Sequence, residues 1–150
     1  MSEGNLMFVG IHHTALSTPD LDRLLRFYCD HFGFEVEFDF PWDEANEAFQ
    51  KTHTLPETAG RVVMISNGTS RLEIFEYRTP KPRPDIPNRA HADLGIAHFC
   101  FQVTDLEKEH ERLKAAGMEF VSGPVEQTPD IVNCYGRDPD GNLIELIEFK

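Results

Sequence analysis

Two histidines and two glutamates occupy matching places in two similar stretches of this chain. IHHTALSTPDL aligns with IAHFCFQVTDL, so that His13 falls on His98, 85 positions later. Each stretch is followed by a strand-like arm that carries a glutamate, which is Glu73 in RLEIFEY and Glu145 in NLIELIEF. A module that repeats histidine and then glutamate predicts one four-ligand site built from two halves.

The four side chains form a donor set suited to a metal ion. Two imidazoles and two carboxylates match a borderline divalent ion such as Ni, Co, Zn, Mn or Fe(II). The set contains no thiolate, which argues against a structural zinc site. Four protein ligands on an octahedral ion would leave two positions for water or substrate, as catalysis requires.

The alternation of side chains along a strand predicts which way these residues face. Phe99 and Phe101 share the face that a helix is expected to cover, so His98 should project to the opposite, concave side of the sheet. Large apolar or aromatic residues flank Glu145 and Glu73 on their own strand faces. An ionised carboxylate among such neighbours is costly unless it is paired or binds a metal.

Each half carries one amphipathic helix with recognisable ends. The first is expected to begin at Thr18, with proline at the first helical position, and to end at Gly33. The second is expected to begin with a capping box of Thr104 and Glu107 and to run to Gly117. Leucines and aromatic residues at helical spacing give the first helix a core-facing stripe.

Strand-like segments follow each helix, and the halves share the order β-α-β-β-β. Asn-Gly after the third segment is a strong hairpin signal, and DPDGN is a tight turn before the last one. The segment between the halves is rich in proline and cannot form a regular element. The strands are expected over 8–17, 34–40, 61–66, 71–77, 96–103, 118–121, 131–136 and from 142 to 149.

These elements predict a single α+β domain over 1–150, made of two modules. The modules span about 7–78 and 95–149 and are joined by the proline-rich linker 79–94. The histidine and glutamate are 60 residues apart in the first half and 47 in the second, and the excess falls mostly in residues 41–60. A long loop of this kind, here with a short helix expected over 43–51, favours a substrate lid.

Composition excludes several classes of partner. The chain has 26 acidic and 14 basic residues, while nucleic acids and anionic membranes need clustered Lys and Arg, so neither is expected to bind. MSEGNLMFVG lacks the basic and apolar parts of a secretory signal, and no apolar run approaches the roughly 20 residues of a membrane span. Cys29, Cys100 and Cys134 have no CxxC spacing, which fits reduced thiols and predicts a cytoplasmic protein.

Three longer motifs together resemble the vicinal oxygen chelate superfamily. They are HxALxxxDLDRLLRFYxxxFGF, HFCFQVTDL and YGRDPDGNLIELIE, and the resemblance covers essentially the whole chain. It implies two βαβββ modules that form a cupped, barrel-like mixed sheet around a metal, the glyoxalase-like fold. The metal positions of the family fall on His13, Glu73, His98 and Glu145, and all four residues are present.

The intact ligand set most resembles that of glyoxalase I. This implies a divalent-metal-dependent isomerase or lyase that abstracts a proton next to a carbonyl, through an enediolate chelated by Ni, Co, Zn or Mn. Glu145 or Glu73 would be the base. The substrate would be a small molecule with vicinal oxygens, and a homodimer is expected, with each site inside one chain or shared between two.

Three alternatives within the superfamily stay open. An acyl-CoA epimerase of the methylmalonyl-CoA epimerase type uses the same chemistry, although its usual double histidine is here Ala97-His98. An extradiol ring-cleaving dioxygenase would use Fe(II), with His53 or Tyr135 as acid-base partner. A bleomycin-resistance-like binding protein needs no metal ligands, and the four intact ligands argue against it.

Overall fold

The computed structural model describes residues 9–83 and 90–150. The contacts divide these residues into two units: 9–19 with 34–81, and 20–33 with 82–83 and 90–150. The expected start of the first strand at Phe8, the start of the first module at residue 7 and positions 84–89 of the linker lie outside the described residues.

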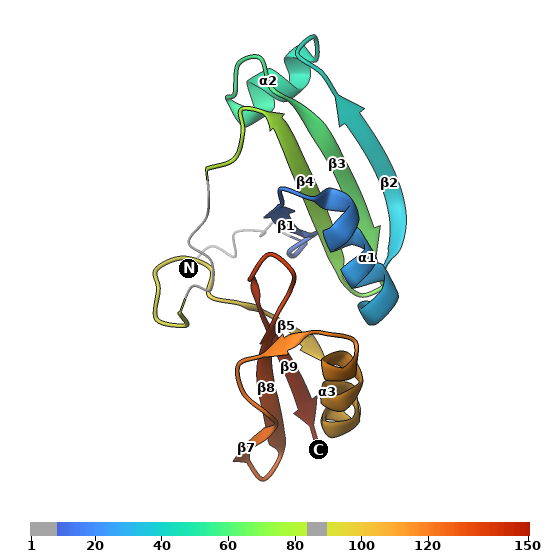
Figure 1. The fold of residues 1–150 in the computed structure, drawn as a ribbon, viewed down its shortest axis with the longest axis vertical. Helices are drawn as coiled ribbons and strands as arrows, with labels where there is room; N and C mark the ends of the chain where they lie inside the picture. The colour runs from blue at the N-terminus through green and yellow to red at the C-terminus, as the bar shows by residue number, and fades with distance from the viewer. Residues whose placement is uncertain (1–8, 84–89) are drawn as a thin grey trace, which may run out of the picture. The chain divides into compact units, whose positions relative to one another are not determined.

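The first unit is a four-stranded mixed sheet with one short helix (Figure 1). The strand order is β1-β4-β3-β2, in which β1 is parallel to β4 and the other pairs are antiparallel. The helix α2 leads from β2 to β3. The elements are β1 (Thr14–Ser17), β2 (Glu35–Trp42), α2 (Glu47–His53), β3 (Ala59–Ser66) and β4 (Arg71–Thr79).

The second unit repeats this topology and adds a strand. Its order is β5-β9-β8-β6, with β7 also beside β8 and β5 parallel to β9. Because β6 and β7 both pair with β8, they take the place that β2 holds beside β3. The elements are α1 (Leu21–Phe32), β5 (Phe99–Gln102), α3 (Leu106–Ala115), β6 (Glu119–Phe120), β7 (Val125–Thr128), β8 (Ile131–Arg137) and β9 (Leu143–Phe149).

The strand register supports the alignment of the two halves. Ala15 pairs with Glu73 across β1 and β4, and Cys100 pairs with Glu145 across β5 and β9. In both halves, therefore, the residue two places after the histidine lies opposite the glutamate. The predicted α+β class and the repeated βαβββ order are confirmed; the strand β7 was not predicted.

The predicted edges of several elements were wrong by a few residues. The two strands expected to carry the histidines begin at Thr14 and Phe99, so that His13 and His98 each lie immediately before a strand. The exposed residues Val9 and Ile11 precede the first of these strands and do not belong to it.

The helix caps also differ from the expected threonines. Asp20 caps α1 by accepting a hydrogen bond from the Arg23 amide at 3.0 Å, and Asp105 caps α3 in the same way at 3.2 Å from the Lys108 amide. Thr18 still belongs to the end of the sheet, since its amide donates to the Phe75 carbonyl. The predicted end of α1 at Gly33 is confirmed, with a left-handed φ of 67°.

Helix α1 packs in the second unit, although it follows the first strand in sequence. Its Phe32 ring lies 4.9 Å from the Phe101 ring, measured between centroids, so a helix does cover the expected face. The buried Tyr28 hydroxyl donates to the Asp138 carboxylate at 2.8 Å, in the turn between β8 and β9. The apolar stripe of α1 predicted that the helix is buried but not against which sheet.

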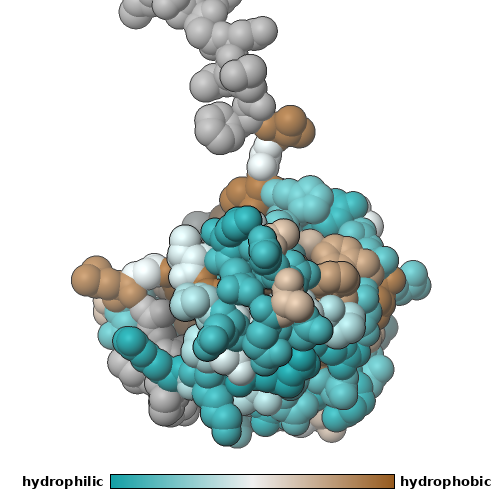
Figure 2. Space-filling model, turned by 90° about the horizontal axis from the view of Figure 1, so that it is seen from above, coloured by the Kyte–Doolittle hydropathy of each residue, from teal (hydrophilic) through white to brown (hydrophobic). Residues whose placement is uncertain are grey.

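The remaining global expectations concern the surface and the thiols. The face shown in Figure 2 is mostly hydrophilic, with separate apolar side chains between polar ones. Cys29, Cys100 and Cys134 are not joined by disulfides. Within 9–83 and 90–150, no helix is both long and apolar enough to cross a membrane.

Candidate metal centre

The structure brings the four predicted ligands together as two pairs. The Nε2 atom of His13 lies 3.2 Å from Oε2 of Glu73, in the first unit. The Nε2 atom of His98 lies 3.0 Å from Oε2 of Glu145, in the second unit. Each histidine therefore contacts the glutamate of its own half, from a position two residues before the one that the register places opposite that glutamate.

No larger cluster is present in the part of the chain that the structure describes. There, three or more His, Cys, Asp or Glu side chains do not gather closely enough to hold a metal ion. The structure thus supplies two bidentate halves, and the four-ligand site remains a prediction.

The geometry of each pair fits a divalent ion. Two neighbouring ligands on an octahedral ion with bonds of about 2.1 Å lie about 3.0 Å apart, and two on a tetrahedral ion about 3.3 Å apart. The observed separations of 3.2 and 3.0 Å fall in this range. The same separation also permits a hydrogen bond between imidazole and carboxylate, which would hold each pair together before an ion binds.

The ring nitrogens that face away from the glutamates differ between the halves. The Nδ1 atom of His13 lies 2.9 Å from Nδ1 of His12. The Nδ1 atom of His98 is buried and has no hydrogen-bond partner among the described residues. An unpaired buried ring nitrogen costs free energy. The Nδ1 atom of His98 could therefore form a hydrogen bond to a metal-bound water or to a substrate.

Polar side chains surround Glu145, which is only 8% exposed. The Asn133 amide donates to its Oε1 at 2.7 Å, and Tyr135 lies directly opposite on β8. Burial, and then the Glu145 charge, raise the pKa of the Tyr135 hydroxyl above its usual value. The same two causes raise the pKa of the Cys100 thiol to about 12. Burial and the nearby Glu145 carboxylate therefore both favour the protonated forms of Tyr135 and Cys100.

Glu73 lies among apolar side chains instead. Ala15 is opposite it on β1 and Met64 on β3, so neither neighbour can donate a side-chain hydrogen bond. Its side chain is 19% exposed. Tyr77 lies two residues beyond Phe75 on the same strand face, and burial followed by the Glu73 charge raises the pKa of the Tyr77 hydroxyl.

An aromatic cluster on the Glu73 face of the sheet is covered by α2. The Phe49 ring stacks on Trp42 with centroids 4.5 Å apart, and His53 contacts Tyr77 edge-on at 6.4 Å. The Trp42 indole lies across Gly60, where an added Cβ would come within 2.5 Å of the ring. Glycine at this position allows the indole to lie flat against β3.

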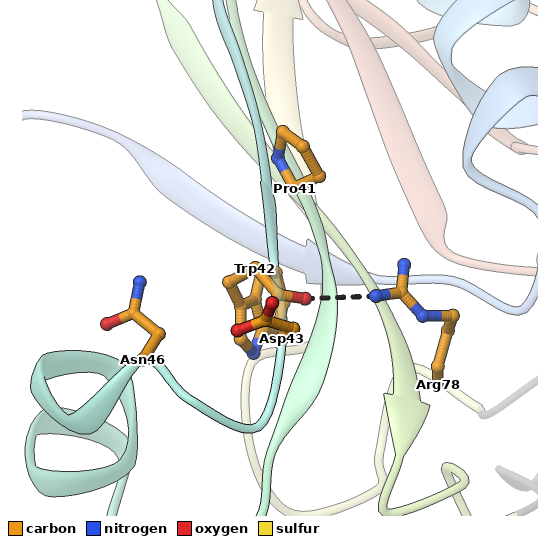
Figure 3. A pocket seen from close by; sticks show the side chains of 5 residues that line it. All are labelled: Pro41, Trp42, Asp43, Asn46 and Arg78. Atoms are coloured by element: carbon orange, nitrogen blue, oxygen red, sulfur yellow. Dashed lines mark hydrogen bonds between the residues drawn. The ribbon is translucent and has the colours of Figure 1, made fainter.

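The segment 41–60 is therefore more ordered than the expected loop. The helix expected over 43–51 is found at 47–53, and β2 and β3 extend into both ends of the segment. Residues of this segment line a cavity of about 300 Å³. Figure 3 shows the side chains around it, among which the Arg78 guanidinium donates to the Trp42 carbonyl at 3.0 Å. The cavity is lined by Pro41, Trp42, Asp43, Asn46 and Arg78.

Sequence reasoning missed Asn133 as a neighbour of the site. It lies on the same face of β8 as Tyr135, and the face could be read from the alternation of β8. Its contact with Glu145 depends on the register between β8 and β9, which the turn sets and the sequence did not reveal. His91 also lies near the site, edge-on against the Tyr135 ring with centroids 4.4 Å apart.

Comparisons with known proteins agree with this architecture. Residues 10–146 match the Glyoxalase/Bleomycin resistance protein/Dioxygenase superfamily. A 2-epi-5-epi-valiolone epimerase from an Actinomyces species is 31% identical over 148 residues, covering 94% of this chain and 80% of that protein. Glyoxalase I of Saccharomyces cerevisiae is 28% identical over 149 residues, covering 93% of this chain and 45% of the yeast protein.

A solved structure extends the comparison to the fold. A glyoxalase family protein from Bacillus cereus superposes with a TM-score of 0.87 at 23% identity, and 99% of each chain is covered. At this identity the likeness speaks for the fold alone. With the family match over most of the sequence and the repeated βαβββ topology, these findings show that the chain belongs to the glyoxalase/bleomycin resistance/dioxygenase, or vicinal oxygen chelate, superfamily.

Proposed function

We propose that this protein is a divalent-metal-dependent isomerase or lyase that moves a proton at a carbon next to a carbonyl. The two His–Glu pairs are the observation that carries the proposal. His13, Glu73, His98 and Glu145 would supply the four ligands of one ion, from one chain or from two chains of a homodimer. The similarity to an epimerase and to glyoxalase I supports an enzyme over a binding protein.

The bound ion would act as a Lewis acid toward two neighbouring oxygens of the substrate. The protein would contribute the proton transfer, for which Glu145 or Glu73 is the base. Their histidine partners hold both carboxylates in place. The aromatic cluster under α2 would exclude water from the Glu73 side, which strengthens electrostatic interactions there.

The choice between isomerisation and lyase chemistry depends on the substrate. Glyoxalase I-like activity remains our first assignment, with Ni, Co, Zn or Mn as the ion. The 31% identical epimerase favours inversion of a stereocentre as the next candidate, and acyl-CoA epimers belong in the same test. The predicted cytoplasmic location suits small metabolites of this kind.

One observation favours the dioxygenase alternative. The Tyr135 ring lies edge-on to the His98 ring with centroids 5.4 Å apart, beside a predicted ligand. An extradiol dioxygenase would use such a residue with Fe(II). Oxygen uptake with catechols by the iron-loaded protein would therefore replace our first assignment.

Deuterium incorporation tests the proposed reaction directly. The protein is loaded with Ni, Co, Zn or Mn and incubated in deuterium oxide with the methylglyoxal–glutathione hemithioacetal or with acyl-CoA epimers. Proton NMR should show exchange at the carbon next to the carbonyl, and Glu145→Gln or Glu73→Gln should reduce kcat by about 100-fold or more. Full turnover in both variants with the metal retained would contradict the carboxylate mechanism.

A further inference from the structure

The internal repeat allows a comparison of the two glutamates in equivalent surroundings. Glu73 pairs with Met64 on the neighbouring strand, and Glu145 pairs with Tyr135. Two residues further along the glutamate strands, Phe75 pairs with Val62 and Ile147 with Asn133. These positions are equivalent because both glutamates also lie opposite the residue two places after the histidine.

The equivalent positions differ in one consistent way. Ala15, Val62 and Met64 around Glu73 are apolar, whereas their counterparts around Glu145 are Cys100, Asn133 and Tyr135. Val62 is buried in the aromatic cluster with Trp42 and Phe75. The two halves therefore share the same pair of predicted ligands, but only Glu145 has polar side chains at these three neighbouring positions.

Asn133 makes the strongest of these new contacts. Its Nδ2 donates to Oε1 of Glu145 at 2.7 Å, while His98 lies 3.0 Å from the other oxygen, Oε2. The two oxygens are thus assigned to different partners, which fixes the rotation of the carboxylate. The Glu73 carboxylate contacts its own histidine, His13, through Oε2 at 3.2 Å. The residue equivalent to Asn133 in this half is Val62, which cannot donate a hydrogen bond.

We propose that Asn133 is a positioning residue that holds the Glu145 carboxylate in place as a metal ligand. This inference rests on the proposed metal-dependent function. Hydrogen-bond partners that orient a ligand typically change metal affinity by about 10–100-fold. A carboxylate already held in place loses less conformational freedom when the ion binds.

The test is the affinity of metal-stripped protein for Co²⁺, measured by competition with a chromophoric chelator at fixed pH. Asn133→Val installs the residue of the first repeat, and Asn133→Leu keeps the approximate shape of the side chain but has no hydrogen-bonding group. Gln102→Val is the matched control, since Gln102 is exposed and lies in the same row of the sheet as Asn133. We expect about 10–100-fold weaker binding in both Asn133 variants and a change of less than about twofold in the control.

A double-mutant cycle separates positioning from a general effect on folding. Combined with Glu145→Gln, Asn133→Val should cost little further affinity, because its partner carboxylate is already gone. Combined with Glu73→Gln, the two losses should add. Circular dichroism of the metal-free proteins shows whether each variant is folded, and Asn133→Leu serves if the valine variant is not.

The outcomes distinguish this inference from the proposed function. Unchanged Co²⁺ affinity in folded Asn133 variants of a metal-binding protein overturns the inference alone, as does an additive cycle with Glu145→Gln. Wild-type protein that binds no divalent ion overturns the proposed function and this inference with it.

Discussion

Cys100 lies opposite Glu145 in the sheet, so the reactivity of its thiol reports on the charge of that carboxylate. Its pKa of about 12 means that only about one thiol in 10⁴ is ionised at pH 8, compared with about a quarter of free cysteine thiols. Alkylation of Cys100 should therefore be on the order of a thousandfold slower than that of a free thiol, and should rise with pH up to the pKa.

Peptide-level mass spectrometry after timed iodoacetamide treatment measures this rate separately for Cys100. Glu145→Gln removes one of the two main causes of the shift and should speed the reaction, although partial burial remains. Labelling of wild-type Cys100 at the rate of a free thiol would show that the Glu145 carboxylate does not face it.

Gly60 is a second residue with a sharp expectation. A Cβ at this position would meet the Glu76 carbonyl at 2.4 Å and the Trp42 ring at 2.5 Å. Gly60→Ala should therefore destabilise the fold by about 1–3 kcal/mol, because the indole and the strand must move apart. In the matched control, Gly123→Ala, the added methyl meets nothing within 4 Å. Thermal melting compares the Tm of the two variants with that of the wild type, and only Gly60→Ala should lower it clearly. An equal Tm for both variants would contradict the close packing of the indole on Gly60.

Among elements, α1 depends on the turn between β8 and β9. The Asp138 carboxylate accepts hydrogen bonds from the Tyr28 hydroxyl at 2.8 Å and from the Asn142 amide at 2.9 Å. Tyr28→Phe leaves a buried carboxylate one donor short, which should cost about 1–3 kcal/mol of unfolding free energy at neutral pH.

This cost should depend on pH in a stated direction. Burial raises the pKa of Asp138, so the folded state binds that proton more tightly than the unfolded state does. The resulting stabilisation is present in acid and is lost as pH rises through the folded-state pKa. The Tyr28 hydrogen bond acts in the opposite direction, because it favours the ionised carboxylate and lowers this pKa. The loss in Tm of Tyr28→Phe should therefore be larger at neutral pH, where Asp138 is ionised, than near the usual aspartate pKa. A larger loss in acid would contradict this account.

The same elements show what the sequence could predict. Periodicity and turn residues located both long helices, the hairpin at Asn67 and the end of α1 at Gly33, since these depend on local chemistry. The short strand β7 and the packing of α1 on Phe101 were missed, because they depend on partners distant in sequence. The aspartate caps were missed because a threonine, which is also a good cap, stands one or two residues before the aspartate at both helix starts.

At the scale of the whole molecule, the repeat is the feature that sequence revealed best. The offset between His13 and His98 predicted two equivalent halves, and the strand registers at Glu73 and Glu145 agree with it. The donors that make the halves unequal could not be predicted, since the pairing of β8 with β9 brings Asn133 to Glu145. The central claim is that the two pairs share one ion.

Metal content per chain tests this claim most directly. Protein purified without chelator or affinity tag is analysed for metals by inductively coupled plasma mass spectrometry. One variant of each predicted ligand is analysed in the same way. We predict about one divalent ion per chain, and a clear loss in each of His13→Ala, Glu73→Gln, His98→Ala and Glu145→Gln. Two ions per chain would contradict a single site built from both halves. So would full metal content in both variants of the same repeat, for example in His13→Ala and in Glu73→Gln.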